Sequence, residues 1–166
     1  QNRDKGMGVT VHIGQRRGNA STSDFSTAAL KATVEAAYNI ARFTAEDDCG
    51  GLPDADLLEM APPDLQLFYP WDIDTAGAVE LAKRAEAAAF DVDARVTNSE
   101  GAGVHVQQSH FVSANSRGFI GGYPYSRHTV SMAAIAGRGA GMQRDDWYVS
   151  VRDASRMASP EAIGRY

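Results

Sequence analysis

The sequence predicts an α+β fold, in which a strand hairpin and a helix are followed by a second helix packed on an antiparallel β-meander. Apolar residues alternate with polar ones over residues 9–13, as in a half-buried strand. Residues 26–44 and 74–89 instead carry apolar or small residues at helical spacing. From Asp93 onward, short β-type runs are joined by turns much shorter than the roughly dozen residues that a parallel crossover needs. Neighbouring strands in this half must therefore pair antiparallel.

The N-terminal elements are expected to be strand, turn, strand and helix. Val9–Ile13 is the first strand, and Gln15–Gly18 is expected to turn the chain, with its last glycine free to take positive φ. Asn19–Thr22 then returns beside the first strand. Ser26 is a good N-cap for the helix, which we expect to end near Thr44, where acidic residues begin.

An acidic, proline-rich segment separates the two halves. Residues 45–74 carry nine acidic side chains, no basic one and four of the six prolines. Like charges repel, and proline interrupts both helices and strands, so we expect an extended linker. A specific ion or partner site is the alternative. The predicted organisation is an N-terminal α/β subdomain at 1–44, the linker at 45–73 and a middle α+β domain at 74–166.

The second half is predicted to begin with a helix capped by Asp74, whose stripe of small residues would let it lie close to a sheet. Short turns at 99–103, 116–118 and 137–139 divide the β-rich remainder of this half into strands. A last helix starts at Ser159, with proline at its first position. The stripe consists of Ala78, Leu81, Ala82, Ala85 and Ala89. The expected strands are 94–98, 104–107, 110–115, 119–123, 128–136 and 142–152.

Both ends of the chain indicate a piece of a longer protein. The chain begins with glutamine rather than methionine, and its last helix stops after about two turns, too short to be stable alone. We expect truncation at the start of the first domain and at the end of the last. An unpaired edge at the first strand would also favour self-association of the fragment.

Charge and composition narrow the function classes. The formal net charge is −5, which argues against a general nucleic-acid binder, because phosphate binding requires a concentrated positive face. Cys49 is the one cysteine, so no internal disulfide can form, as is usual in a reducing compartment. No apolar run approaches the roughly 20 residues that cross a bilayer. We expect a cytoplasmic protein without membrane contact or direct contact with nucleic acid.

No residue pattern in the chain predicts a catalytic or metal site. The four histidines, His12, His105, His110 and His128, lack the helical spacing that turns two imidazoles toward one metal ion. Cys49 has no CxxC partner, and no Gly-x-Ser-x-Gly elbow occurs. We therefore expect no cofactor on this segment.

An aromatic and arginine cluster is the candidate surface for a partner or a peptide. Such residues are enriched in interface cores, and a long strand edge could also bind an extended peptide through its backbone. Sheet packing with cation–π pairs is the alternative. The candidate residues are Tyr123, Tyr125, Arg127, His128, Arg144 and Trp147.

Sequence blocks spread in order over nearly the whole chain carry a family resemblance. Two of these blocks distinguish one branch of the family from the other. They are Arg17–Ser26, with Ser21–Asp24 at its centre, and Met142–Asp145. Further blocks are Thr33–Ala37, Ile40–Ala41, Glu46–Asp47, Gly51–Leu52, Asp64–Leu65, Tyr69–Trp71, Asn98–Ala102, Asn115–Ser116, Gly118–Phe119 and Trp147–Tyr148. Together they resemble the PmbA/TldE branch of the TldD/PmbA family, over the N-terminal and middle portions of its members. Asp146 departs from the pattern, which has an aromatic residue there.

The resemblance implies that the parent protein is one subunit of a cytoplasmic TldD/TldE-type zinc metallopeptidase, a heterodimer that degrades or processes unfolded peptides. The zinc-binding HExxxH helix belongs to the TldD branch, and this chain has no such motif. Zinc is therefore expected on a TldD-type partner subunit, and no catalytic residue carries over to this chain. The family has also been connected with maturation of a modified antibacterial peptide, antitoxin degradation and modulation of DNA gyrase.

The leading hypothesis is a fragment of the non-catalytic subunit, which shapes the heterodimer and helps to enclose a peptide. One alternative is a stand-alone metalloprotease whose metal site lies further along the parent chain. Another is a regulator of DNA gyrase, or of another partner, that works without proteolysis.

Overall fold

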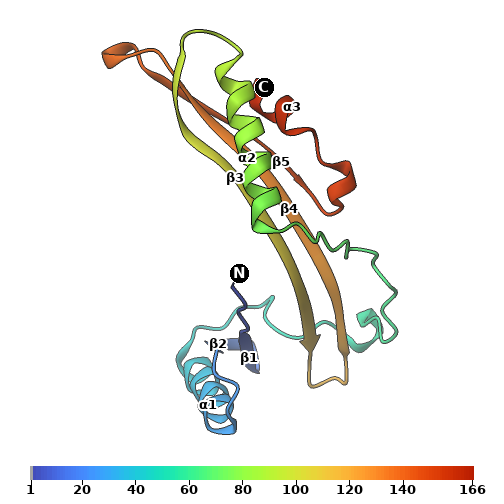
Figure 1. Cartoon of the computed structure of the whole chain (residues 1–166). Coiled ribbons are helices and arrows are strands. Elements are labelled where there is room, and N and C mark those ends of the chain that lie inside the picture. The colour runs from blue at the N-terminus through green and yellow to red at the C-terminus, as the bar shows by residue number, and fades with distance from the viewer. Residues whose placement is uncertain (1) are drawn as a thin grey trace. The chain divides into compact units, whose positions relative to one another are not determined.

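The computed structural model of the chain describes residues 2–166, which form two compact units (Figure 1). The first unit comprises the residues up to 59 with the short segment 115–117, and the second comprises 60–114 and 118–166. Each unit has an antiparallel sheet with helix packed on it. The α+β class predicted from the sequence is confirmed.

The first unit is a hairpin covered by a helix. Strands β1 (Met7–Ile13) and β2 (Arg16–Thr22) pair antiparallel, and helix α1 (Thr27–Phe43) packs on them. The predicted cap is confirmed, because the Ser26 hydroxyl accepts a hydrogen bond from the backbone N–H of Ala29 at 3.3 Å. This bond satisfies a donor that the first turn of a helix otherwise leaves without a partner.

The predicted hairpin turn at 15–18 is wrong, because the chain turns at 14–15. Gly18 lies within β2 instead and is buried. A Cβ at this position would overlap the carbonyl oxygen of Ala37 and lie 2.5 Å from the backbone nitrogen of Ala41. Glycine is required here because the backbone of α1 packs directly on the strand, and not because the chain turns.

The acidic segment 45–73 contains one short 3₁₀ turn, Ala55–Leu57, and is otherwise neither helix nor strand. Its charge and its prolines disfavour regular helix and strand. The end of the segment packs in the second unit, where the Leu67 carbonyl accepts a hydrogen bond from the backbone N–H of Ser126 at 3.0 Å.

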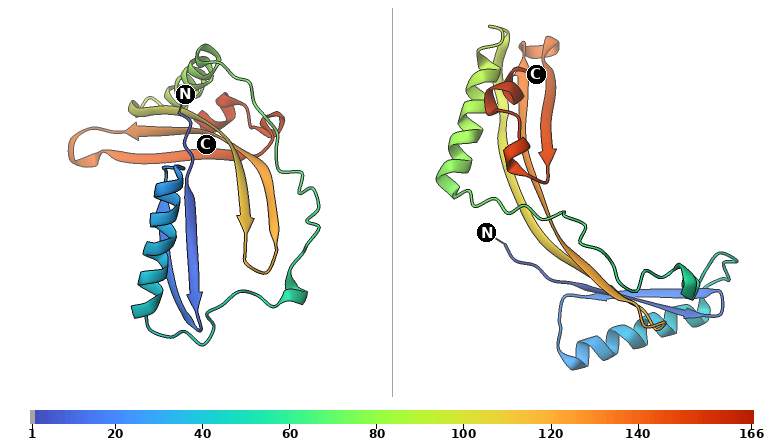
Figure 2. Two further views of the ribbon diagram at one scale, coloured as in Figure 1. Left: turned by 90° about the horizontal axis from the view of Figure 1, so that it is seen from below. Right: turned by 90° about the vertical axis from the view of Figure 1, so that its right-hand side faces the viewer.

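The second unit is a three-stranded sheet with two helices on one face (Figure 2). The strand order is β3-β4-β5, and all neighbours are antiparallel. Two further 3₁₀ turns, η2 (Gly139–Gly141) and η3 (Ala154–Arg156), flank the last strand. The main elements are α2 (Thr75–Phe90), β3 (Val96–Ala114), β4 (Ile120–Ala136), β5 (Gln143–Val151) and α3 (Pro160–Arg165).

Small residues on α2 let the helix lie close to the sheet, as predicted. Both helices of this unit begin at their predicted caps, Asp74 and Ser159. Within residues 2–166, no helix combines the length and the apolar character needed to span a bilayer. The buried core between helices and sheet consists of Ala85, Ala89, Val130, Met132 and Ile163.

Where the sequence predicts six short strands in this half, the structure has three long ones. The turn predicted at 99–103 is wrong, because β3 continues through it with two register shifts and with Gly101 at φ +104°. The predicted breaks at 108–109 and 124–127 are also absent. A glycine inside a β-run is compatible with either a turn or a bulge, and only the pairing with β4 decides between them. The predicted turns at 116–118 and 137–139 are confirmed.

Candidate functional site

Residues of β4 alternate between the two faces of the sheet in the second unit. Ser126, His128 and Val130 are fully or almost fully buried on the face that α2 and α3 cover. The odd-numbered side chains of β4 point the other way, because the side-chain period of a strand is two. Residues paired with them on β3 and β5 lie on the same side. We call this second side the open face. Its residues include Gln107 and Phe111 of β3, Tyr123, Tyr125 and Arg127 of β4, and Arg144 and Ser150 of β5.

The open face contains a hollow of about 490 Å³. Three aromatic rings form a row in it, with centroids 5.6 Å apart for Phe111 and Tyr123 and 6.1 Å apart for Tyr123 and Tyr125. These rings contact one another, and no cation–π contact to them is found within residues 2–166. The hollow is lined by Leu67, Gln107, Phe111, Tyr123, Tyr125, Arg127, Ser150, Val151 and Arg152.

Two arginines lie in this hollow without a carboxylate among the residues that line it. The Nε of Arg127 donates a hydrogen bond to the Ser150 hydroxyl at 3.0 Å. Arg152 follows directly after β5, whose last paired residue, Val151, lies opposite His128. The side chains that line the hollow therefore carry net positive charge.

Two of the six candidate residues do not reach the open face. His128 is fully buried on the helix side, where its Nε2 lies 2.9 Å from the Tyr69 carbonyl oxygen and its ring meets Trp71 edge-on at 5.4 Å. Trp147 is paired with Met132 in the register and stacks on Tyr166, with ring centroids 4.0 Å apart. Both are sequence neighbours of open-face residues, and the strand period places them on the opposite side.

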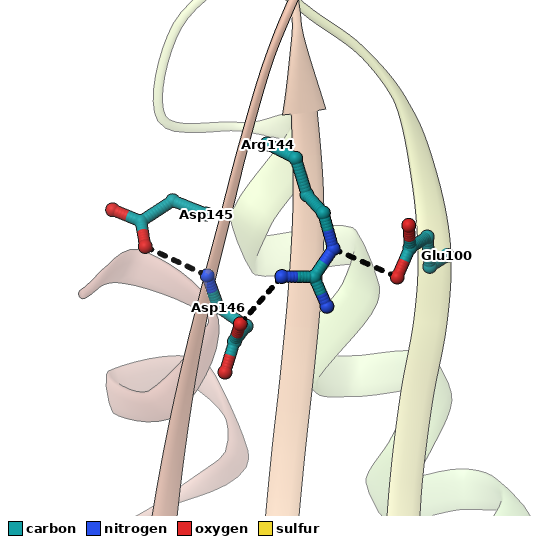
Figure 3. A network of polar contacts seen from close by, with 4 residues as sticks. All are labelled: Glu100, Arg144, Asp145 and Asp146. Atoms are coloured by element: carbon teal, nitrogen blue, oxygen red, sulfur yellow. Dashed lines mark hydrogen bonds and ion pairs between the residues drawn. The ribbon is translucent and has the colours of Figure 1, made fainter.

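Arg144 lies on the open face, but its charge is already compensated (Figure 3). Its Nε donates to Glu100 Oε2 at 2.9 Å, and its Nη1 donates to Asp146 Oδ1 at 2.6 Å. These bonds, first of all the one to Glu100, raise the pKa of Arg144. The neighbouring Asp145 accepts a hydrogen bond from the backbone N–H of Asp146 at 2.9 Å. Arg144 therefore ties β5 to β3 across the sheet.

Replacing Arg144 by glutamine is expected to leave the midpoint of chemical denaturation nearly unchanged. The Arg144, Glu100 and Asp146 side chains are each about half exposed, so water and salt screen both ion pairs. Urea denaturation of both proteins at low and high salt measures the effect. A large loss of stability that persists in high salt would show that the ion pairs act as a buried network instead.

The histidines are dispersed over the fold. His12 lies on β1 in the first unit, His105 and His110 lie on β3, and His128 is buried on β4. In the part of the chain that the structure describes, no three His, Cys, Asp or Glu side chains form a group that could hold a metal ion.

Sequence reasoning missed several residues of the hollow. Phe111 and Gln107 could have been found by counting back from the turn at 116–118, because the hairpin register sets Phe111 opposite Tyr123. Leu67 gives no local signal, because it reaches the hollow from the acidic segment. Glu100 was hidden by the predicted turn, although it binds Arg144.

Comparison with known proteins matches this α+β chain to two domain models of one family, whose members are described as metallopeptidases. Residues 68–166 match the family model of the PmbA/TldA metallopeptidase central domain, and residues 1–41 match domain 1 of the same proteins. The chain belongs to the PmbA/TldD metallopeptidase family.

Several relatives align with almost the entire chain. Metalloprotease PmbA of Escherichia coli O157:H7 is 41% identical over 163 residues, which are 98% of this chain and 36% of the relative. The metalloprotease PmbA homologue of Haemophilus influenzae is 42% identical over 161 residues, which are 97% of this chain and 36% of the relative. The chain thus spans about a third of the length of these relatives.

Solved structures show the same fold. A protein of Bacteroides thetaiotaomicron, described as a candidate modulator of DNA gyrase, superposes with a TM-score of 0.80 at 21% identity and covers 96% of this chain and 37% of its own. TldE from Thermococcus kodakarensis superposes with a TM-score of 0.52 at 14% identity and covers 90% of this chain and 33% of its own. At these identities the likeness concerns the fold alone.

Proposed function

We propose that this chain is part of the non-catalytic PmbA/TldE subunit of a cytoplasmic TldD/TldE-type zinc metallopeptidase, which degrades or processes unfolded peptides. The observation that carries the proposal is the 41% identity to a PmbA protein over 98% of the chain. The branch-specific blocks Ser21–Asp24 and Met142–Asp145 support the same branch. Zinc and the catalytic residues would then be supplied by the TldD-type partner.

In this proposal the chain supplies shape and contact surface. The organisation into 1–44, 45–73 and 74–166 is supported by the family models, which match 1–41 and 68–166. The open face supports a role in peptide or partner contact, because aromatic and arginine side chains gather there as they do in interface cores.

The test uses the full-length protein that contains this chain, together with a TldD-type subunit from the same organism. We expect hydrolysis of an unfolded peptide only when both subunits are mixed, and loss of that hydrolysis on chelation. Size-exclusion chromatography of the mixture should show one complex that contains both proteins. A matched mixture whose TldD-type subunit lacks its metal-binding histidines should be inactive.

Activity of the full-length protein by itself, lost on chelation, would contradict the non-catalytic assignment. That result would favour the alternative of a stand-alone metalloprotease, in line with the name of the curated relatives.

A regulator of DNA gyrase is the second candidate, because two of the solved structures with this fold are described as candidate modulators of that enzyme. Retention of gyrase by the full-length protein in the absence of any TldD-type subunit would support it. No retention under those conditions, with peptide hydrolysis by the mixture, would favour the peptidase proposal.

A further inference from the structure

We propose that the hollow on the open face binds acidic side chains of an extended peptide, with apolar or aromatic residues beside them. The inference deepens the proposed function, since it rests on the view that this subunit handles unfolded peptides and names the peptide chemistry that it selects.

The charged side chains that line the hollow favour an acidic ligand. Arg127 and Arg152 both line the hollow, and none of the residues that line it is acidic. Some other arginines of this unit do have carboxylate partners, as Arg84 has with Glu161 and Arg144 has with Glu100 and Asp146. A carboxylate from outside the chain would compensate this positive charge and accept hydrogen bonds from a guanidinium group.

The geometry around Arg127 favours a fixed binding position. The Nε of Arg127 is held by the Ser150 hydroxyl, and Ser150 in turn accepts a hydrogen bond from the Thr129 hydroxyl at 3.0 Å. This arrangement fixes one edge of the guanidinium group and leaves its other donors for a ligand. Arginine held in this way loses less side-chain freedom on binding than a freely rotating surface cation.

The aromatic row supplies the apolar part of the site. Phe111, Tyr123 and Tyr125 lie in the same hollow as the two arginines, and Phe111 is half exposed. Apolar side chains of a bound peptide would cover these rings while a neighbouring carboxylate meets the arginines. The volume of about 490 Å³ suits a few side chains rather than a folded domain.

The carboxylate is assigned to a side chain and not to a peptide terminus. Along β4, Arg127 has Tyr123 and Tyr125 on one side and Thr129 on the other, and the Thr129 hydroxyl donates a hydrogen bond to that of Ser150. A peptide would therefore find contacts on both sides of its charged residue, as an internal aspartate or glutamate requires.

Binding of two matched peptides to the 166-residue chain tests the proposal. One is an acetylated and amidated hexapeptide with two central glutamates between leucines, and the other has glutamines in their place. We expect the glutamate peptide to bind about tenfold more tightly at low salt, as measured by fluorescence anisotropy. The difference should shrink when the salt rises to about 0.5 M, because exposed charges are then screened.

Variants locate the site. The double substitution Arg127→Gln/Arg152→Gln should remove most of the tenfold preference for the glutamate peptide. The control Arg17→Gln/Arg138→Gln removes the same charge from two exposed arginines that have no side-chain hydrogen bond or ion pair among the described residues. It should keep the preference. Arg152→Gln alone, which breaks no side-chain bond among the described residues, guards against a double variant that fails to fold.

Three outcomes would overturn the proposal: equal binding of the two peptides, an equal loss in the control variant, or equally tight binding of a glutamine peptide with a free C-terminal carboxylate. None of these measurements needs a TldD-type subunit. Failure of the proposed function would appear in the mixing experiment instead, so the two failures are distinguishable.

Discussion

Replacing Gly164 by alanine is expected to lower the free energy of unfolding of the second unit by about 2–3 kcal/mol, the upper part of the range for an overpacked position. A Cβ at this position would overlap the carbonyl oxygen of Ala85 and come within 3.0 Å of the Ala88 Cβ. The first obstacle is helix backbone, which cannot rotate away as the end of a side chain can. Helix α3 would have to move off α2, and its neighbouring Ile163, now 2% exposed, would leave the core.

Chemical denaturation followed by circular dichroism measures this loss. Gly141→Ala is the matched control, since a Cβ there meets nothing within 4 Å and the residue does not have positive φ. It should change the unfolding free energy little. If both variants were equally stable, the close contact between α2 and α3 would be wrong.

The elements that the sequence predicted well are those decided by local chemistry. Ser26, Asp74 and Ser159 each cap a helix by accepting a hydrogen bond three residues further on, a pattern visible in a few consecutive residues. The structural role of a glycine could not be predicted from its neighbours in the sequence. Gly18 serves a close helix contact and Gly101 a bulge, and both roles depend on partners that are distant in sequence.

In the candidate surface, too, the residues set by local sequence were predictable and those set by distant contacts were not. Tyr123, Tyr125 and Arg127 were found because they are close in sequence and share the period of one strand. The strand period also shows why His128 cannot join them, although the sequence cluster included it. Leu67 could not be predicted, since a tertiary contact brings it to the hollow.

Replacing Ser126 by alanine is expected to cost about 1–3 kcal/mol, because it removes a buried hydroxyl that bonds two backbone groups. Ser126 is fully buried. Its hydroxyl accepts a hydrogen bond from the Tyr69 backbone N–H at 2.9 Å and donates one to the Arg152 carbonyl at 2.8 Å. The hydroxyl thus joins the end of the acidic segment to the end of β5 beneath the hollow, where Leu67 and Arg152 both contribute side chains.

The loss of stability should therefore be accompanied by weaker binding of the glutamate peptide, although Ser126 itself faces the helix side. Ser113→Ala, at an exposed position of β3 without a side-chain hydrogen bond among residues 2–166, is the control and should alter neither property. Denaturation and peptide titration of both variants give the comparison. A Ser126→Ala protein as stable as the Ser113→Ala protein would mean that the hydroxyl does not hold the two segments together. The position of Arg152 in the hollow would then need another cause.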